Sequence, residues 1–411
     1  MSGTVKGQTL DLDQPGLISA QDIIGQWLPC PSCVASNGSN WSLIGGQRSA
    51  NGQNYNRDML LEGVFAAVTT SFYADGRPYW RKLEHNVDRY SLTAMSGLVL
   101  LGSTGEAVLL SDEESREVLR VARGAAAADK VLVAGVGRES VIETVRLAEY
   151  AAELAYDVVL VRTPHYYRKQ MREREMLTYY QAVADRSPLP VLLYSIPSCT
   201  GYDLPIGVVA ELAMHPNIVG MKDSSGDVAR IGELVTATRA AAKRTVAVTN
   251  VFAAVTSRML AQQPPAGGAT FVTADQLAAG STAIAVAPPK PALKTRTREV
   301  GFQLLCGSAQ TLYPSLAAGA TGGILALAAF APQASCEVYT AWAEKDEGLA
   351  AEKQQRIAQA GVDVCGKMGI PGVKYALDLN GYYGGRPRMP LLPLTGEEQR
   401  RVEELLADIR N

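Results

Sequence analysis

The sequence predicts an α/β protein built around a (β/α)8 barrel, the TIM-barrel architecture. The first observation is a series of short, largely apolar runs, each followed by turn residues and an amphipathic helical pattern. The second is their number and spacing: eight such runs occur, and most begin roughly 25 to 35 residues apart, which fits one strand, one helix and two short loops. Apolar strands that alternate with helices form a parallel sheet covered by helices, and eight such repeats close a barrel.

The predicted strands lie within segments that can be quoted in chain order. They are GVFAAVTT from Gly63, GLVLLGSTGE from Gly97, KVLVAGVG from Lys130, DVVLVRTPH from Asp157, PVLLYSIPS from Pro190, NIVGMKDSS from Asn217, FQLLCGSA from Phe302 and GGILALAA from Gly322. A doubly wound open sheet would also alternate strands with helices. The first predicted strand, however, is not followed by the GxGxxG loop of dinucleotide-binding folds, so we favour the barrel.

Helix start signals place the loops of this barrel. Ser111 followed by Glu114 is a capping box that opens an amphipathic helix, so residues 102–110 form the loop between the second strand and that helix. Active sites of barrels are built from such loops at the carboxyl ends of the strands. Because Ser103, Tyr194 and Lys222 all lie at predicted strand ends, we expect them to converge on one mouth of the barrel.

The regions outside the strand–helix repeat define the domain organisation. Residues 1–55 are polar and rich in Gly and Asn, and we expect a disordered N-terminal arm. The barrel spans residues 56–332. Within it, residues 244–298, rich in Ala, Thr, Pro and Gly, make the interval before the seventh strand too long for one helix, which predicts an insertion on the N-terminal face. Residues 333–411 form a C-terminal helical appendix whose last helix is capped by Thr395 with Glu398.

Composition restricts the partners and the compartment. The 411-residue chain carries 39 Lys and Arg against 41 Asp and Glu, so no basic field attracts nucleic acid or an anionic membrane. No stretch reaches the roughly 18 uninterrupted apolar residues that span a bilayer, and the first residues lack the apolar region of a secretory signal. We therefore expect a cytoplasmic protein whose partner is a small molecule.

The cysteines and histidines give little support for a metal centre. Cys30 and Cys33 form a single CPSC pair, and the other four cysteines are scattered singly through apolar segments. A structural zinc site usually takes four ligands, and the chain contains only three histidines. The sequence predicts neither a metal nor a cofactor.

Lys222 is the first candidate for chemistry, because it ends the apolar strand of the segment NIVGMKDSSGD. A buried ammonium loses several kcal/mol of hydration unless it is paired or deprotonates. A lysine is nucleophilic only when neutral, and burial can lower a reference pKa of about 10.4 by up to about 3 to 5 units, which makes a Schiff base feasible. The alternative is an ion pair with Asp223 at the rim of the barrel.

Two further strand ends carry polar groups. Tyr194 ends a strand in PVLLYSIPSCTG, where its hydroxyl can relay protons to a neighbouring carbinolamine or can serve as a buried structural tyrosine. The GSTGE loop, residues 102–106, offers backbone N–H groups and two hydroxyls near a helix, which suits a small carboxylate.

Taken together, these motifs resemble the dihydrodipicolinate synthase/N-acetylneuraminate lyase family of pyruvate-handling class I aldolases. The resemblance runs from about Gly63 to about Leu394, apart from the insertion, through GSTGE, RTPHYYR, YSIPSCTG, HPNIVGMKDSSGD, CGSA and GIPGVKYALDLNGYYGG. Within the family the chain looks most like the 4-hydroxy-2-oxoglutarate aldolases, which share the YYR, HPNIVGMKDS and GYYGG segments.

The resemblance assigns roles to particular residues. It implies that Lys222 is the Schiff-base lysine, that Tyr194 relays protons, and that Ser103 and Thr104 hold the substrate carboxylate. Tyr166 matches the aromatic residue that family members extend across a subunit interface, which implies a homo-oligomer, a tetramer or a dimer; from the residues alone it is an exposed loop aromatic. The remaining residues look like distal substrate contacts: Ser224, Ser225, Gly307 and Ser308.

Two departures from the family pattern bear on the substrate. The lysine-biosynthesis enzymes of the family carry an arginine in the YN-P-RTG motif to grip a second carboxylate, whereas this chain has Cys199. Thr104 stands where the most similar aldolases tend to have asparagine. We therefore expect cleavage of 4-hydroxy-2-oxoglutarate or a related 2-oxo acid to pyruvate and glyoxylate. The alternatives are another pyruvate-type reaction, such as a 2-keto-3-deoxy sugar-acid aldolase, a dehydratase or a dihydrodipicolinate synthase, and a barrel that binds 2-oxo acids without turnover.

Overall fold

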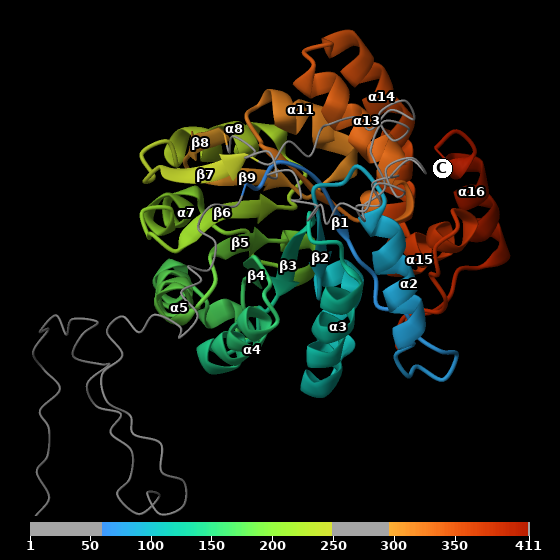
Figure 1. The fold of residues 1–411 in the computed structure, drawn as a ribbon, viewed down its shortest axis with the longest axis horizontal. Helices are drawn as coiled ribbons and strands as arrows, with labels where there is room; N and C mark the ends of the chain where they lie inside the picture. Colours follow the sequence, from blue (N-terminus) through green and yellow to red (C-terminus); the bar gives the residue numbers. More distant parts are fainter. Residues whose placement is uncertain (1–59, 249–295, 410–411) are drawn as a thin grey trace, which may run out of the picture. The chain divides into compact units, whose positions relative to one another are not determined.

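The (β/α)8 prediction is confirmed by the structure, a computed structural model that describes residues 60–248 and 296–409. Within these residues eight parallel strands close into a barrel in the order β1-β10-β9-β6-β5-β4-β3-β2 (Figure 1). The strands are β1 (Gly63–Ala67), β2 (Gly97–Leu100), β3 (Val131–Gly135), β4 (Val158–Arg162), β5 (Val191–Ser195), β6 (Ile218–Asp223), β9 (Gln303–Cys306) and β10 (Gly322–Leu325). Each strand lies within one of the predicted segments.

Helices follow the barrel strands and cover the outside of the sheet (Figure 1). They are α2 (Trp80–Ser91), α3 (Asp112–Ala125), α4 (Val141–Glu153), α5 (Glu173–Arg186), α7 (Ile206–Leu212), α8 (Val228–Ala237), α11 (Leu312–Ala317) and the short α12 (Leu327–Phe330). The predicted capping box is present, since the backbone N–H of Glu114 donates to Ser111 Oγ at 3.2 Å and the backbone N–H of Ser111 donates to Glu114 Oε2 at 3.0 Å. It fixes where α3 begins and where the preceding loop ends.

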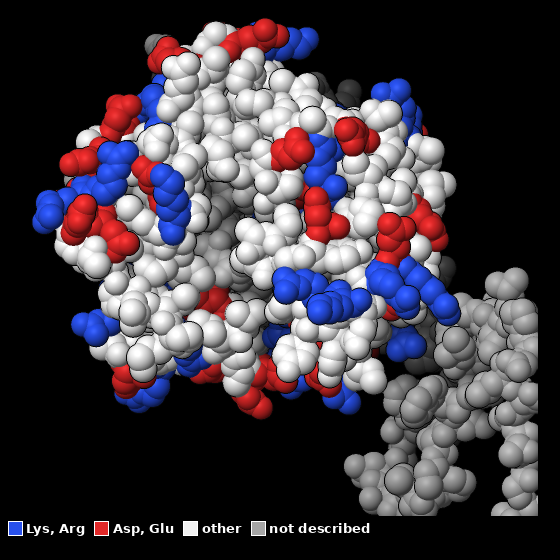
Figure 2. Space-filling view, turned by 180° about the vertical axis from the view of Figure 1, so that it is seen from behind, with Lys and Arg blue, Asp and Glu red and all other residues white. Residues whose placement is uncertain are grey.

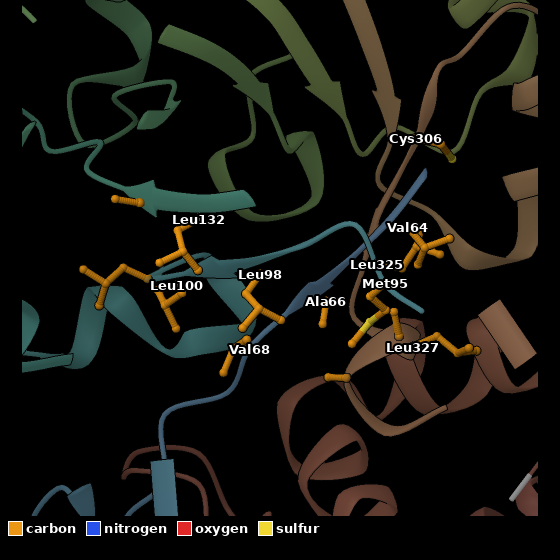
Figure 3. Packing of buried hydrophobic residues seen from close by; sticks show 14 of the residues in the cluster. Val64, Ala66, Val68, Met95, Leu98, Leu100, Leu132, Cys306, Leu325 and Leu327 are labelled. Carbon is orange, nitrogen blue, oxygen red and sulfur yellow. The ribbon is translucent and has the colours of Figure 1, made fainter. Parts of the chain in front are cut away.

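Alternate strand residues divide the apolar core into two clusters. The inner cluster draws on all the barrel strands and fills the barrel, with members such as Phe65, Val133, Leu192 and Tyr194. The larger cluster lies between the strands and the helices, and Val64, Ala66 and Val68 contribute to it from β1 and the residue after it (Figure 3). The inner cluster therefore packs directly beneath the residues at the carboxyl-terminal mouth of the barrel.

An antiparallel pair of strands, β7 (Arg244–Val248) and β8 (Arg296–Val300), lies where the insertion was predicted. The prediction did not include these strands. Nη2 of Arg244 donates to Gln303 Oε1 at 2.6 Å, and Gln303 begins β9, so this end of the pair lies beside the amino end of a barrel strand. Burial lowers the pKa of Arg244 to about 10. Residues 249–295 of the predicted insertion, the predicted arm at residues 1–55, and Cys30 and Cys33 lie outside the described residues.

The C-terminal helices follow the barrel and are coloured orange to red in Figure 1. They are α13 (Pro332–Ala343), α14 (Glu347–Ala360), a π-helical segment (Gly361–Lys367), α15 (Gly369–Leu379) and α16 (Gly396–Leu406). Thr395 caps α16 together with Glu398, as the sequence predicts. Among the described helices, none is both long and apolar enough to cross a membrane. On the face drawn in Figure 2, Lys and Arg side chains are interspersed with Asp and Glu.

Candidate active site

An irregularity in strand β6 turns the side chain of Lys222 into the barrel. The pairing of β6 with β5 shifts by one residue at Val219, so that Lys222 pairs with Tyr194, a member of the inner core. Without this bulge, Lys222 would have the orientation of Ile218, which belongs to the outer core. Bulges of this kind often re-aim a side chain beside an active site. The local backbone therefore places the lysine at the carboxyl end of the barrel interior.

Lys222 and Tyr194 are in direct contact at this mouth. Nζ of Lys222 lies 4.2 Å from the centre of the Tyr194 ring, and the lysine is only 4% exposed. A cation above an aromatic face is attracted by the ring quadrupole, but the attraction replaces only part of the hydration that burial removes. Among the described residues no carboxylate lies within 4.0 Å of this amine, as an ion pair would require.

The ion pair between Lys222 and Asp223, which the sequence left open, does not form. Nε of Arg230 lies 2.9 Å from Asp223 Oδ2, and the hydroxyl of Ser225 donates to Asp223 Oδ1 at 2.5 Å. Asp223 is buried and points away from the barrel interior, because successive strand residues face opposite sides. An ion pair with Asp223 therefore does not explain why Lys222 is buried. The hydroxyl of Ser225, a predicted substrate contact, is already hydrogen-bonded to Asp223.

The GSTGE loop lies beside the tyrosine. Ser103 begins a short 3-10 turn (Ser103–Gly105), and its Oγ lies 3.4 Å from the Tyr194 hydroxyl. Thr104, the next residue of the turn, is partly exposed. Ser103, Tyr194 and Lys222 thus lie together, as the sequence predicts from their positions at strand ends.

Tyr166 stands on the loop after β4 and is 77% exposed. Its backbone N–H donates to Glu139 Oε2 at 3.0 Å, and its ring packs edge-on against Tyr167. Burial works against ionisation of Glu139, but hydrogen bonds from the backbone of Tyr166 and from Arg162 outweigh it and lower the pKa. The ring of Tyr166 therefore projects from an anchored backbone.

A cavity of about 410 Å³ opens between these loops. Ser103, Tyr166 and Tyr194 line it, together with the charged side chains of Arg138 and Arg162. Lys222 and Thr104 are not part of the lining that the described residues form. The amine of Lys222 instead lies against the ring of Tyr194, a residue that lines the cavity.

The other predicted contacts lie at the ends of β6 and β9. A Cβ added to Gly307 would fall 1.9 Å from Ser224 Oγ and 2.9 Å from the Asp223 carbonyl oxygen, so only glycine fits this close approach. Ser308 follows Gly307, and its backbone N–H lies 3.4 Å from the Cys306 sulfur. Gly307 therefore keeps β9 close to the residue that follows the lysine strand.

A buried ion pair that the sequence did not predict lies beneath the GSTGE loop. Nζ of Lys374, from α15, lies 2.6 Å from Oε1 of Glu106, and both side chains are 0% exposed. The backbone N–H of Arg388 donates to the other oxygen, Oε2, at 2.7 Å. The available signal was a lysine in the middle of the apolar helical segment GIPGVKYAL, since a buried ammonium needs an anionic or carbonyl partner.

Comparison with known proteins extends this description. Residues 60–274 and 291–409 match the Dihydrodipicolinate synthetase family. The chain belongs to this family. A 4-hydroxy-tetrahydrodipicolinate synthase from Methanothrix thermoacetophila is 28% identical over 347 residues, which cover 84% of this chain and 96% of that protein. Another, from Xanthomonas campestris pv. campestris, is 38% identical over 180 residues, 43% of this chain and 58% of that protein.

Solved structures agree on the fold. A chloride-inhibited dihydrodipicolinate synthase from Acinetobacter baumannii, complexed with pyruvate, has a TM-score of 0.67 and 26% identity, and the match covers 85% of this chain and 99% of that one. A dihydrodipicolinic acid synthase family protein from E. coli K12, also in complex with pyruvate, gives a TM-score of 0.67 at 24% identity, with coverage of 85% and 99%. The family that the sequence motifs indicate, whose enzymes are aldolase-type and handle pyruvate, is thereby confirmed.

Proposed function

We propose that this family member is a class I aldolase that cleaves 4-hydroxy-2-oxoglutarate, or a related 2-oxo acid, to pyruvate and glyoxylate. The observation that carries the proposal is the position of Lys222. Its amine is buried against the Tyr194 ring at the barrel mouth, and no described carboxylate pairs with it. An amine in such surroundings is suited to act as a nucleophile.

The chemistry begins at the C2 carbonyl of the substrate. The neutral amine of Lys222 adds to this carbon, and the carbinolamine loses water to give a protonated imine. Removal of the C4 hydroxyl proton breaks the C3–C4 bond, and the electron pair moves into the imine to give an enamine while glyoxylate leaves. Protonation of the enamine at C3 and hydrolysis of the imine release pyruvate and restore the amine.

Tyr194 is the proposed proton carrier in these steps. Tyr194 lines the cavity and its hydroxyl lies 3.4 Å from the Ser103 hydroxyl, so a proton can pass between the site and the loop. Ser103 and Thr104 would hold the C1 carboxylate through the turn that they form. The exposed ring of Tyr166 would complete the site of another subunit in a homotetramer or dimer.

The synthase reaction is the second candidate, because the relatives named above are synthases. Cys199, exposed on the short helix α6 (Pro197–Thr200) after β5, stands where synthases carry the arginine that grips a second carboxylate. A neutral cysteine thiol offers neither the charge nor the paired donors of a guanidinium. The same site is also compatible with a sugar-acid aldolase, with a dehydratase, and with a barrel that binds 2-oxo acids without turnover.

Two measurements test the proposal. Sodium borohydride added with pyruvate should reduce an imine, and peptide mass mapping should locate the pyruvate-derived mass on the peptide that contains Lys222. A panel of 2-oxo acids, with aspartate semialdehyde plus pyruvate for the synthase reaction, should then show the fastest turnover with 4-hydroxy-2-oxoglutarate. An unmodified Lys222 would refute the covalent mechanism, and faster condensation with aspartate semialdehyde would replace the aldolase assignment by the synthase.

A further inference from the structure

The buried pair of Glu106 and Lys374 connects the C-terminal helices to the loop of the proposed site. Nζ of Lys374 lies 2.6 Å from Glu106 Oε1, with which it forms an ion pair, and it donates hydrogen bonds to the carbonyl oxygens of Thr70, at 2.8 Å, and Arg386, at 3.0 Å. Both hydrogen bonds are directed to backbone carbonyl groups, and neither charged side chain reaches solvent. Burial lowers the pKa of Lys374, and the attraction of Glu106 opposes that shift.

Glu106 needs such an anchor because its backbone is strained. Its φ of 57° lies in the left-handed region, which a side chain longer than that of glycine or asparagine rarely adopts. Leu101, at the other end of the turn, also has a φ of 57°. Conformations of this kind persist only where the surrounding structure holds them. The two strained residues flank the Ser103–Gly105 turn, which carries the proposed carboxylate ligands.

A second anchor comes from Arg388 on the segment after α15. Its backbone N–H holds Glu106 Oε2, and its guanidinium donates to the carbonyl oxygens of Leu109, at 2.8 Å, and Gly76, at 3.0 Å. The same guanidinium forms two 2.6 Å hydrogen bonds to the carboxylate of Glu114. Both oxygens of Glu106 are therefore held by the C-terminal appendix and by no residue of the turn itself among those described.

Stability alone is a weak reason for such a pair. Removing two charges from water costs nearly as much as their attraction returns, and well-packed apolar residues often replace buried pairs without loss. A buried pair does, however, fix one geometry, because each partner tolerates few other positions. Catalysis requires such a fixed geometry, because a displacement of a binding group by about 1 Å can lower the rate about 100-fold.

We infer that Lys374 is a positioning residue that holds the Ser103–Gly105 turn in its carboxylate-binding shape through Glu106. The inference rests on the proposed function for the identity of the ligand, a 2-oxo acid, but the conformation of the turn can be measured without any ligand. Lys374 touches neither substrate nor Lys222 in this scheme and acts through Glu106.

The experiment compares three variants with the wild type. Lys374→Met removes the ammonium, and the double variant Glu106→Gln/Lys374→Met removes both charges, so that a folded protein is available if the single variant is too unstable. Lys130→Met is the matched control, because Lys130 is also buried but donates to the carbonyl oxygens of Thr93 and Met95 at the amino end of β3. The readouts are amide hydrogen exchange of the 102–106 peptide without ligand and the pyruvate concentration for half-maximal borohydride trapping.

We expect exchange at the Gly105 and Glu106 amides, whose N–H groups bond to Gly102 and Ser103, to accelerate at least about tenfold in both Lys374 variants and not in Lys130→Met. The half-maximal pyruvate concentration should rise by at least about tenfold, while the trapping rate at saturating pyruvate falls less than about threefold. Exchange unchanged in the folded variants, or equally accelerated by Lys130→Met, overturns the inference, as does faster exchange with unchanged pyruvate dependence. If the wild type traps no pyruvate, the proposed function fails, and the exchange comparison still decides whether Lys374 holds the turn.

Discussion

Asp223 forms a buried ion pair with Arg230, although Lys222 precedes it directly in the chain. The Arg230 Nε lies 2.9 Å from Asp223 Oδ2, and Nη2 lies 3.1 Å from Asp203 Oδ1. Asp203 in turn accepts a hydrogen bond from the Ser195 hydroxyl at 3.1 Å. This network joins the carboxyl ends of β5 and β6, the strands that carry Tyr194 and Lys222. Arg230 therefore pairs with the buried carboxylate and links the carboxyl ends of the two strands.

Replacing Arg230 by methionine should destabilise the protein strongly. The variant keeps most of the aliphatic length but leaves Asp223 buried without its cation, and breaking a buried pair in this way costs about 3 to 5 kcal/mol. Urea denaturation monitors the loss. Arg120→Met is the control, because Arg120 forms an exposed pair with Glu117 on α3, and this variant should keep a free energy of unfolding near that of the wild type. A loss below about 1 kcal/mol for Arg230→Met would show that the network is not energetically coupled to folding.

Lys222→Arg should abolish turnover and leave the fold intact. Arginine retains a positive charge, but its guanidinium stays protonated and does not form the imine. We expect activity to fall by several orders of magnitude and borohydride trapping of pyruvate to disappear. Circular dichroism and thermal melting check that folding is retained. Appreciable residual cleavage by a homogeneous preparation would count against covalent catalysis.

Tyr194→Phe separates the hydroxyl from the ring. The ring would stay against Lys222, whereas the group 3.4 Å from Ser103 Oγ would be lost. A positioned proton donor contributes about 100- to 10,000-fold, so kcat should fall within that range while the Lys222 adduct still forms slowly. The control is Tyr156→Phe, which removes a buried hydroxyl that donates to the Leu119 carbonyl of α3 at 2.9 Å, in the core between the strands and the helices. This variant should keep kcat near the wild-type value. Equal effects of the two substitutions would argue for a structural role only.

The barrel could be predicted from the sequence because its strands are buried on both faces. Segments such as Val131–Gly135 and Val191–Ser195 read as unbroken apolar runs, and helix caps such as Ser111 mark the boundaries between the repeats. Strands β7 and β8 have no such signal. RTVAV and RTREV include charged residues, and their pairing depends on two segments far apart in the chain.

The sequence predicts which residues form the candidate site, but not the orientation of Lys222 or the contacts that support the site. The strand-end positions of Lys222, Tyr194 and Ser103 follow from the apolar pattern, since parallel strands end at one mouth. The bulge at Val219 depends on the neighbouring strand, and without it the pattern would point Lys222 outward. The contact of Glu106 with Lys374 depends on how the C-terminal helices pack, which no local pattern in the sequence specifies.

Gly307→Ala should impair catalysis by separating β9 from β6. The new methyl group would fall 2.9 Å from the Asp223 carbonyl oxygen and 1.9 Å from Ser224 Oγ, and the backbone contact cannot be relieved by a side-chain rotation. Overpacking of this kind costs about 1 to 3 kcal/mol and should displace the end of β6, with a fall in kcat of at least about tenfold. The matched control is Gly232→Ala in α8, where nothing lies within 4 Å of the new methyl group and helix propensity favours alanine by about 1 kcal/mol. A Gly307→Ala enzyme with wild-type kcat and stability would show that β9 can move without affecting Lys222.

Asp363→Asn should reveal a stabilising charge whose effect disappears in acid. Hydrogen bonds from Gln359 and Lys367, and then from Arg401 of α16, lower the pKa of Asp363 from 3.8 to about 2. A carboxyl whose pKa is lower in the folded than in the unfolded state binds fewer protons when folded, so its stabilisation is full above about pH 5 and declines as the pH falls from about 4 toward 2. The asparagine variant carries no ionisable group there and lacks this contribution at every pH. Urea midpoints measured between pH 7 and pH 3 should therefore differ most at pH 7 and approach each other toward pH 3. A difference that stays constant or widens in acid would mean that Asp363 stabilises the docking of α16 through its shape and not through its charge.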